Sequence, residues 1–459
     1  MKIAVLNGSP KGEISVTVQY VKFIQKKLPQ HEFKLINIAH DILKLEKDAG
    51  NFRQVIDEVK ASDGVMWAFP LYVFLVCSQY KHFIEMVWEN KAGAAFKGKY
   101  ACALSTSIHF FDHTAHNYIR GISEDLGMNF TESFSADMDD IFIDDKRRIL
   151  LKWAGDFLSA IEHKTPTVQL YAPVVHSKFR YEPGKAAGKV DLKGQKVRVL
   201  ADIEDEKSNI ARMVHRFSAT FNGQIDVKRF QDINVRGGCL GCMECAFDNE
   251  CVYKGKDEFM EFFNANMRDQ DVTIFAGAIK DRYFSSRIKM FMDRSFFNGH
   301  IPTQIGKQFG FIVSGPLAQL PNMQEIMQAQ AEMSEANFTG VVTDEAGDSA
   351  QIDALLDDLA GRCVENAEQK YLRPWTFLGV GGHKIFRDQI WSRLRFPFDA
   401  DFRFYDAHGM FDFPQNDTRY MEFSSQMIKA IQDPNVRQMV RKMIKTEMLK
   451  GYQKVVETK

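Results

Sequence analysis

Four of the seven cysteines lie close together in the middle of the chain. Thiolates bind soft metal ions and iron-sulfur clusters. A cubane cluster needs four of them around one centre, and glycines let the backbone wrap around it with N–H groups facing the sulfurs. The spacing C-x2-C-x2-C-x5-C, with glycines at 237, 238 and 241, therefore predicts a [4Fe-4S] cluster bound by Cys239, Cys242, Cys245 and Cys251.

Two alternatives to a cluster stay open for these cysteines. A structural zinc ion also takes four thiolates, although zinc sites usually draw them as two pairs separated by a longer loop. The cysteines could also form a metal-free group of redox-active or buried thiols. The metal content of the protein distinguishes these alternatives.

A hydroxyl-rich loop at positions 7–17 follows the first apolar run. Its side chains, its backbone N–H groups and the start of a helix expected at 18–27 can together bind an anion. The loop has neither the Gly-Lys-Ser/Thr of nucleotide-hydrolysing loops nor the glycine spacing of dinucleotide-binding loops. We therefore expect flavin mononucleotide (FMN), with its phosphate bound by Ser9, Lys11, Ser15 and Thr17.

Two further loops follow later apolar runs. In a parallel sheet the loops after the strands share one edge, so these loops could enclose the flavin ring. His109, together with His113 and His116, could donate to the ring or to a substrate, and the alternative is that they are ordinary surface histidines. The expected ring contacts are Pro70, Leu71, Tyr72, Val73, Ser105, Thr106, Ser107 and His109.

The elements that position these loops follow from the hydrophobic pattern. Short apolar runs at 2–6, 33–38, 64–69, 100–105 and 130–134 alternate with amphipathic stretches. This alternation is typical of an α/β domain with a doubly wound parallel sheet, which we place at 1–163. Residues 164–196 contain prolines, glycines and mostly basic charge, and we expect a linker there.

The pattern then repeats. Residues 63–131 align with 271–339 at a constant offset of 208, whereas the opening strands at 3–6 and 197–200 align at 194. We expect a second domain of the same fold at 197–370, with the cysteine loop as its insertion, although unrelated α/β units also share chance identities. Residues 371–459 fit neither copy, and we expect an aromatic and helical extension that packs over the domains.

The second copy differs at the phosphate loop. Its loop carries four carboxylates, Asp202, Glu204, Asp205 and Glu206, where a phosphate dianion would sit. Like charges repel, so we expect this copy to bind flavin weakly or not at all.

Residues 2 to about 160 resemble the flavodoxin-like, NAD(P)H-dependent FMN reductase family. The resemblance lies in Gly8-Ser9-Pro10, in Ser15 and Thr17, and in Pro70-Leu71-Tyr72, while Ser105-Thr106-Ser107 lacks the glycines common in the third flavin loop of that family. The cysteine spacing and the segment from Lys289 to Arg294 resemble the iron-sulfur flavoprotein branch, here in a tandem-domain form.

The resemblance implies two flavodoxin-like domains and an oxidoreductase that uses both cofactors. In that branch the cluster of one subunit lies near the FMN of a neighbour, so in a fused chain the cluster of the second copy would face the FMN of the first. We expect electrons to pass between them and to reduce a small-molecule acceptor, with NAD(P)H or a ferredoxin as donor. No side chain is assigned a catalytic role, because the cofactor carries the chemistry.

Other functions remain possible. The chain could be an electron-transfer or redox-sensing protein without an organic substrate of its own, or an FMN reductase whose second domain is stabilised by zinc. The glycines at 379, 381 and 382 are similar to a dinucleotide-binding run, but such a run is more often a turn.

Composition excludes other classes. The 59 Lys and Arg residues nearly balance the 60 Asp and Glu residues, which gives a formal net charge of −1 and no basic surface for nucleic acid. No run approaches the roughly 18 apolar residues of a membrane span, and the first expected strand begins at position 2 without a signal peptide. We expect a cytoplasmic protein, and the resemblance allows a homo-oligomer.

Overall fold

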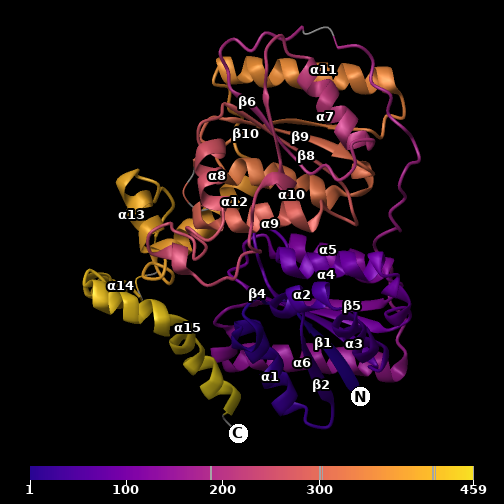
Figure 1. Cartoon of the computed structure of the whole chain (residues 1–459). Coiled ribbons are helices and arrows are strands. Elements are labelled where there is room, and N and C mark those ends of the chain that lie inside the picture. The colour runs from indigo at the N-terminus through magenta and orange to yellow at the C-terminus, as the bar shows by residue number, and fades with distance from the viewer. Residues whose placement is uncertain (187–188, 299–300, 302, 416–417, 419, 458–459) are drawn as a thin grey trace. The chain divides into compact units, whose positions relative to one another are not determined.

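The computed structural model contains two five-stranded parallel sheets (Figure 1). It describes residues 1–459 apart from 187–188, 299–300, 302, 416–417, 419 and 458–459, and apart from the side chain at position 445. Among the described residues, no helix is both long enough and apolar enough to cross a membrane. The chain divides into two compact units, one made of 1–173, 238–248 and 385–459, and the other of 174–237 and 249–384.

The first sheet has the strand order β2-β1-β3-β4-β5, as the apolar runs predict. The central strands are buried on both faces, which explains their continuous apolar sequences. The strands are β1 (Lys2–Asn7), β2 (Glu32–Asn37), β3 (Gly64–Pro70), β4 (Tyr100–Ser107) and β5 (Asn129–Asp137).

Helices cover both faces of this sheet. On one face α1 and α6 share a hydrophobic core with the strands, and it includes Tyr20, Trp153 and Phe157. The other helices, among which α2 contacts α4, complete the doubly wound arrangement (Figure 1). The helices are α1 (Val16–Lys27), α2 (Ile38–Lys47), α3 (Ala49–Lys60), α4 (Ser78–Glu89), α5 (Asp112–Asp125) and α6 (Asp144–His163).

The second sheet has the order β10-β9-β8-β6-β7, which is the topology of the first. Its strands are β6 (Val197–Ala201), β7 (Asp226–Arg229), β8 (Val272–Ala278), β9 (Gln308–Ser314) and β10 (Asn337–Thr343). Its helices are α7 (Asn209–Ala219), α8 (Phe259–Met267), α9 (Ser286–Arg294), α10 (Pro321–Met333) and α11 (Ser349–Glu368). A core that joins α7 and α11 to the strands includes Phe217 and Leu356.

The structure confirms the predicted repeat. The strands β3, β4 and β5 begin at 64, 100 and 129, and β8, β9 and β10 begin at 272, 308 and 337, so each pair keeps the offset of 208. Ile3 pairs with Gly64 in the first sheet, and Val197 pairs with Val272 in the second, so the opening strands keep the offset of 194. The extra residues of the second copy lie between β7 and β8, where the cysteine loop was expected.

The cysteine loop also takes the place of a helix. In the first copy α2 follows β2 directly and packs on α4. In the second copy β7 is followed by a short 3-10 turn, η4 (Phe230–Asp232), and then by the loop, which contains a second one, η5 (Glu244–Ala246), before α8 begins. Glycines and closely spaced cysteines replace the amphipathic pattern that forms α2, so no equivalent helix can form there.

The C-terminal region is helical, as expected. It comprises α12 (Phe377–Trp391), α13 (Asp399–Ala407), α14 (Met421–Ala430) and α15 (Pro434–Glu457). On α15, Leu449 and Tyr452 are buried in the same core as α1 and α6. The domain bounds 1–163, 164–196, 197–370 and 371–459 stay predictions, but residues from 385 onward belong to the compact unit of the first sheet.

Candidate functional site

The phosphate loop is ordered by Asn7, the last residue of β1. Its Nδ2 donates to the Gly12 carbonyl at 3.2 Å, and its Oδ1 accepts from the Ser9 amide at 3.1 Å. Gly12 has a φ of +59°, a left-handed conformation that glycine adopts without strain. These bonds hold the loop in one conformation, with the predicted side chains Ser9, Ser15 and Thr17 buried in it.

The N-terminus of α1 points into this loop without a side-chain cap. Ser15 occupies the N-cap position, but within the described chain its side chain accepts no capping hydrogen bond. The amides of the first helical turn therefore remain available to an anion. Thr17 Oγ1 lies 2.6 Å from Thr106 Oγ1, which brings the phosphate loop and the third loop together as the sequence predicted.

The two predicted ring loops contain strained backbone. Tyr72 and Leu75 exchange backbone hydrogen bonds of 2.9 Å in a tight turn after β3. Val73 and Phe74 inside that turn have φ of +29° and +66°, and His109 after β4 has a φ of +62°. Such conformations cost energy in residues other than glycine and cluster at functional sites. The absence of glycines from the third loop thus does not prevent the left-handed turns.

Polar side chains order the third loop. Ser107 Oγ accepts the His109 amide at 2.9 Å, and His109 Nδ1 lies 2.9 Å from Asp112 Oδ2. The hydrogen bond with Asp112 raises the pKa of the exposed His109 imidazole. Burial alone would raise the pKa of Asp112, but bonds with His109 and Ser135 lower it. His109 therefore favours the protonated form beside the expected ring position.

The Ser105 side chain lies in the protein interior. Its hydroxyl is fully buried and lies 2.8 Å from His116 Nε2. Burial lowers the pKa of His116 from 6.5 to about 4, so this imidazole stays neutral near pH 7. The structure thus distinguishes the exposed His109 from the buried His116, which the sequence could not do.

The cysteine loop belongs to the compact unit of the first sheet, because residues 238–248 group with 1–173. Gln79 on α4 donates from Nε2 to the Cys239 carbonyl at 2.9 Å. A Cβ added at Gly241 would collide with the Tyr72 hydroxyl and would lie 3.2 Å from Lys11 Cε. Three of the four predicted ligands, Cys239, Cys242 and Cys245, are therefore carried by a segment that contacts both the ring loop and the phosphate loop.

Backbone amides of the cysteine loop donate to sulfur atoms. The Gly241 amide donates to Cys239 Sγ at 3.4 Å, and Cys251, in the second compact unit, donates its own amide to Met260 Sδ at 3.2 Å. All four cysteines are partly exposed, whereas Cys77, Cys102 and Cys363 are buried. Among the described residues, no three His, Cys, Asp or Glu side chains form a group that could hold a metal ion.

The C-terminal helices hold the cysteine loop within the first unit. Arg441 on α15 forms ion pairs with Asp248 and, at 3.7 Å, with Glu244. Phe247 packs in one cluster with Phe396, and the same cluster includes Ile431 and Ile444. Further along α15, the Tyr452 ring packs against Phe142, with the ring centroids 4.7 Å apart and the ring planes tilted by 47°. One end of α15 thus contacts the loop and the other end contacts the domain of the first sheet.

The equivalent phosphate loop of the second copy is closed by its own side chains. The Asp202 amide donates to Ala276 O at 2.8 Å, as the Gly8 amide donates to Ala68 O at 2.7 Å, so Asp202 replaces Gly8. Its carboxylate accepts from Arg287 Nη1 at 2.6 Å. At the next helix, Ser208 caps α7 by accepting the Ala211 amide at 3.3 Å.

Three of the four carboxylates of that loop form ion pairs with cations: Asp202 with Arg287, and Glu204 and Glu206 with the residues that follow. Glu204 pairs with Lys280 at 2.5 Å, and Glu206 pairs with Arg229 at 2.5 Å. These cations offset the repulsion that the sequence suggested. They come from other parts of the chain, so the sequence of the loop alone did not show them. Weak or absent flavin binding by this copy stays a prediction.

The glycine run at 379–382 lies inside α12 and not in a turn after a strand. The N-terminus of that helix is occupied by Glu332, which accepts from the Thr376 amide at 3.0 Å and the Gly379 amide at 2.7 Å. A carboxylate already satisfies the donors that a dinucleotide phosphate would need. The resemblance to a dinucleotide-binding run is therefore wrong.

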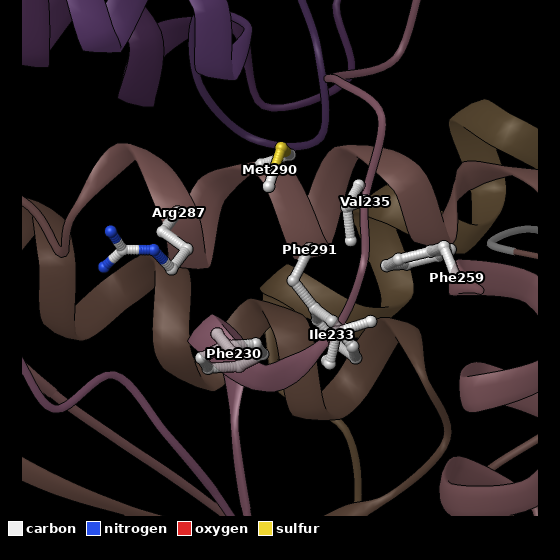
Figure 2. A pocket seen from close by; sticks show the side chains of 7 residues that line it. All are labelled: Phe230, Ile233, Val235, Phe259, Arg287, Met290 and Phe291. Atoms are coloured by element: carbon white, nitrogen blue, oxygen red, sulfur yellow. The ribbon is translucent and has the colours of Figure 1, made fainter. Parts of the chain in front are cut away.

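A small apolar pocket lies where the second copy has no counterpart of α2. Figure 2 shows its aromatic side chains gathered together, with the Arg287 guanidinium directed away from them. Residues before the cysteine loop, α8 and α9 contribute its lining, which consists of Phe230, Ile233, Val235, Phe259, Arg287, Met290 and Phe291.

Similarity to a known protein family covers the part of the chain that contains the phosphate loop and the ring loops. Residues 1–134 match the NADPH-dependent FMN reductase family. This match confirms the predicted resemblance for the FMN reductase-like region, by which we mean residues 1–134. The resemblance to iron-sulfur flavoproteins stays a prediction. No curated protein is significantly similar to the chain.

Solved structures are similar to 35–36% of the chain. FerB, a flavoenzyme NAD(P)H:(acceptor) oxidoreductase from Paracoccus denitrificans, is 21% identical, with 35% of this chain and 97% of that chain covered and a TM-score of 0.30. An FMN-dependent NADH-azoreductase from Bacillus anthracis is 14% identical, with coverages of 36% and 99% and a TM-score of 0.26. An NAD(P)H:quinone oxidoreductase from Methanothermobacter marburgensis is 15% identical, with coverages of 36% and 98% and a TM-score of 0.25.

Several residues of the site have no signal in the sequence. Gln79, Asp112 and Arg441 are ordinary helix residues until the fold brings them beside Cys239, His109 and Asp248. Their partners are set by tertiary contacts. Only Asp112, three residues after His109, had a spacing that could have suggested a pair.

Proposed function

We propose that the chain is an NAD(P)H- or ferredoxin-dependent flavin oxidoreductase that passes electrons between a [4Fe-4S] cluster and FMN and reduces a small-molecule acceptor. The observation that supports it best is the contact between the segment carrying Cys239, Cys242 and Cys245 and the loops expected to bind FMN. Three of the four proposed cluster ligands thus belong to the same compact unit as the loops expected to bind the flavin.

FMN fits the residues of the first copy. The uncapped N-terminus of α1 and the hydroxyls of Ser9, Ser15 and Thr17 suit its phosphate, and Lys11 supplies a cation. The turn from Pro70 to Val73 and the third loop, with Ser105, Thr106, Ser107 and His109, would border the ring. Bound FMN would exchange electrons singly with a cluster and in pairs with an organic molecule.

The chain's own residues would position the acceptor and supply protons. The exposed His109, held through Nδ1 by Asp112, could donate a proton from Nε2 to an acceptor bound against the ring. The aromatic side chains of Phe74, Phe110 and Phe111 lie together, with ring centroids 4.9 to 5.6 Å apart, and would exclude water beside it.

The case for a cluster rests on the number and spacing of the cysteines. Their side chains do not form a metal-binding group among the described residues, and Cys251 belongs to the second compact unit. Four thiols on a short glycine-containing loop, with an amide directed at Cys239 Sγ, are nevertheless the residue types that a bound cluster requires. Cys239, Cys242, Cys245 and Cys251 would be its ligands. If these cysteines bind zinc instead of a cluster, metal analysis would show it.

The test is the cofactor content of protein purified without air. Iron, sulfide, zinc and flavin are measured per chain together with the ultraviolet-visible spectrum. We expect about four irons and one FMN. Zinc without iron would show that the cysteines form a structural zinc site, and the chain would then be an FMN reductase without a cluster. The matched variants are Cys242→Ser, which should lose iron and keep FMN, and Cys363→Ser, a buried cysteine outside the loop, which should keep both.

Donor assays follow on the same protein. Steady oxidation of NADH or NADPH with quinone, nitro or azo acceptors would establish the nicotinamide as donor. Failure with both, together with reduction by a ferredoxin, would establish the second route. Reversible reduction without turnover of any acceptor would instead indicate an electron-transfer or redox-sensing protein.

A further inference from the structure

The second half of α12 and the turn that follows it contact the loops of the first sheet. The Phe386 ring packs edge-on against Phe110, with the ring centroids 5.2 Å apart and the ring planes at 82°. Seven residues later, Arg393 forms an ion pair with Asp137, the last residue of β5. Residues from 385 onward belong to the compact unit of the first sheet. The C-terminal region therefore contacts both the loop after β4 and the loop after β5 within that unit.

Arg393 fixes this segment to the end of β5. Its Nη1 donates to Asp137 Oδ1 at 2.6 Å and to Asp139 Oδ2 at 2.8 Å, and its Nη2 donates to Asp137 Oδ2 at 3.1 Å. Between the two aspartates, the Met138 amide donates to the Ser107 carbonyl at 3.1 Å. The arginine thus connects the C-terminal region to the turn that orders the third loop.

Four phenylalanines form one aromatic cluster beside the third loop. Phe74 and Phe111 are buried, with ring centroids 4.9 Å apart, and Phe110 packs on both. Thr114 Oγ1 lies within hydrogen-bond distance of the carbonyls of Phe74 and Phe111, so the buried pair joins the two ring loops. Phe110 and Phe386 remain partly exposed. They present an aromatic surface on this fixed base.

This surface adjoins the exposed His109, the proton donor of the proposed function. His109 and Phe111, on either side of Phe110, have φ of +62° and +54°, conformations that cost energy in residues other than glycine. The Cα atoms of His109 and Phe110 are one peptide apart, about 3.8 Å, so a molecule of two fused rings can reach both side chains. The match to the FMN reductase family ends at residue 134, so Phe386 lies outside the matched region.

We propose that Phe386 is a specificity-determining residue of the acceptor site, where it and Phe110 bind a flat acceptor of two or more fused aromatic rings. This inference rests on the proposed function, in particular on FMN in the first copy, and does not depend on the cluster. Aromatic rings favour edge-to-face and offset-stacked contacts, and two partly exposed rings at 82° offer both an edge and a face. A single ring has less apolar area to bury on them.

The test uses full-length, FMN-loaded protein in its oxidised state. It is titrated with 2-naphthol or phenol, which the flavin does not reduce, and the flavin absorbance is followed so that binding beside the ring gives the signal. Phe386→Ala should weaken 2-naphthol binding about tenfold, or about 1.4 kcal/mol, and phenol binding less than about twofold. Phe386→Leu, which stays apolar but loses the ring, should fall between. The control is Phe377→Ala, an exposed phenylalanine at the start of α12, which should leave both affinities unchanged.

A kinetic measurement separates the acceptor from the donor. The protein is reduced photochemically and mixed with 1,4-naphthoquinone or 1,4-benzoquinone, so that no nicotinamide is present. Phe386→Ala should raise the naphthoquinone concentration for half-maximal reoxidation about tenfold and leave the limiting rate unchanged, because it removes binding and not chemistry. An effect confined to the KM for NADH or NADPH would overturn the proposal.

The outcomes separate this inference from the proposed function. Wild-type protein that binds no FMN would overturn both. Protein with FMN and without iron would overturn the electron path of the proposed function, and the titrations would still decide this inference. Equal 2-naphthol affinities in wild type and Phe386→Ala would overturn only the role of Phe386. Equal losses for 2-naphthol and phenol would also overturn it, because a merely disturbed loop weakens both. If Phe386→Ala fails to fold, Phe386→Leu decides by the same two criteria.

Discussion

The two copies share a topology but differ at the edge where the loops gather. Both have the strand order of one doubly wound sheet, and both bury an ion pair one turn along the equivalent helix, Lys81 with Glu85 and Lys289 with Asp293. The first copy leaves a helix N-terminus open beside its phosphate loop, whereas the second caps the helix with Ser208 and fills the loop with ion pairs.

The two copies also differ in which of two facing positions carries a large side chain and which carries glycine. A Cβ at Gly8 would lie 2.9 Å from Phe69 Cβ and 2.7 Å from the Tyr80 ring, so only glycine fits there. The second copy has Asp202 in place of Gly8 and Gly277 in place of Phe69. The same fold can thus present an anion site or a closed ion pair, depending on which of two facing positions carries the side chain.

The largest expected effect comes from giving the first copy the loop of the second. Gly8→Asp should abolish FMN binding, with affinity reduced at least ~100-fold, because the side chain collides with Tyr80 and its charge repels the phosphate. Flavin content and calorimetric titration measure it. The mirrored control, Asp202→Gly, should leave the FMN content unchanged. Normal flavin content in folded Gly8→Asp would contradict the assignment of the phosphate loop.

The next effect is a pH dependence confined to the first copy. His116 has a pKa of about 4 when buried, against 6.5 when exposed. The unfolded chain therefore binds a proton between these values and the folded chain does not, so the free energy of unfolding falls as the pH drops from about 6.5 to about 4. The difference corresponds to roughly 3 kcal/mol. Urea unfolding at several pH values, followed for the first unit, measures it.

The second copy has Gln324 at the position equivalent to His116. His116→Gln should therefore remove most of this acid destabilisation. If the variant keeps the wild-type pH dependence, other groups cause it and the distinction between the copies at this position fails.

A smaller pair of effects concerns the two helix N-termini. Ser208→Ala should lower the free energy of unfolding by about 1 kcal/mol, because Ser208 caps α7. Ser15→Ala should leave the stability of flavin-free protein nearly unchanged, because the Ser15 side chain does not cap α1. It should weaken FMN binding about tenfold, because the Ser15 hydroxyl is expected to bind the phosphate. Thermal unfolding and FMN titration of both variants measure this. Equal effects on stability would show that the helix ends do not differ in role.

The smallest effect concerns the attachment of the cysteine loop to the first unit. Arg441→Ala removes two partly exposed ion pairs, which are worth about 0.5 kcal/mol. Amide hydrogen exchange in residues 238–248 should rise about twofold. Lys442→Ala, the exposed neighbour, is the control and should leave exchange unaltered. Unchanged exchange in Arg441→Ala would mean that the apolar cluster around Phe247 alone retains the loop.

The sequence determined the two sheets, because strands that are buried on both faces must be continuously apolar. It also determined their repeat, because the strands of the two copies keep the same spacing along the chain. It also supplied the predictions for the phosphate loop and the cysteine loop, since residue type and spacing near one strand end need no distant partner. The fold decided what depends on distant contacts: the pairing of the carboxylates in the second copy, the separate roles of His109 and His116, and the attachment of the cysteine loop to the first unit. The carboxylate pairs and the loop attachment depend on groups far apart in the chain, and the roles of the two histidines depend on burial, and only packing fixes both.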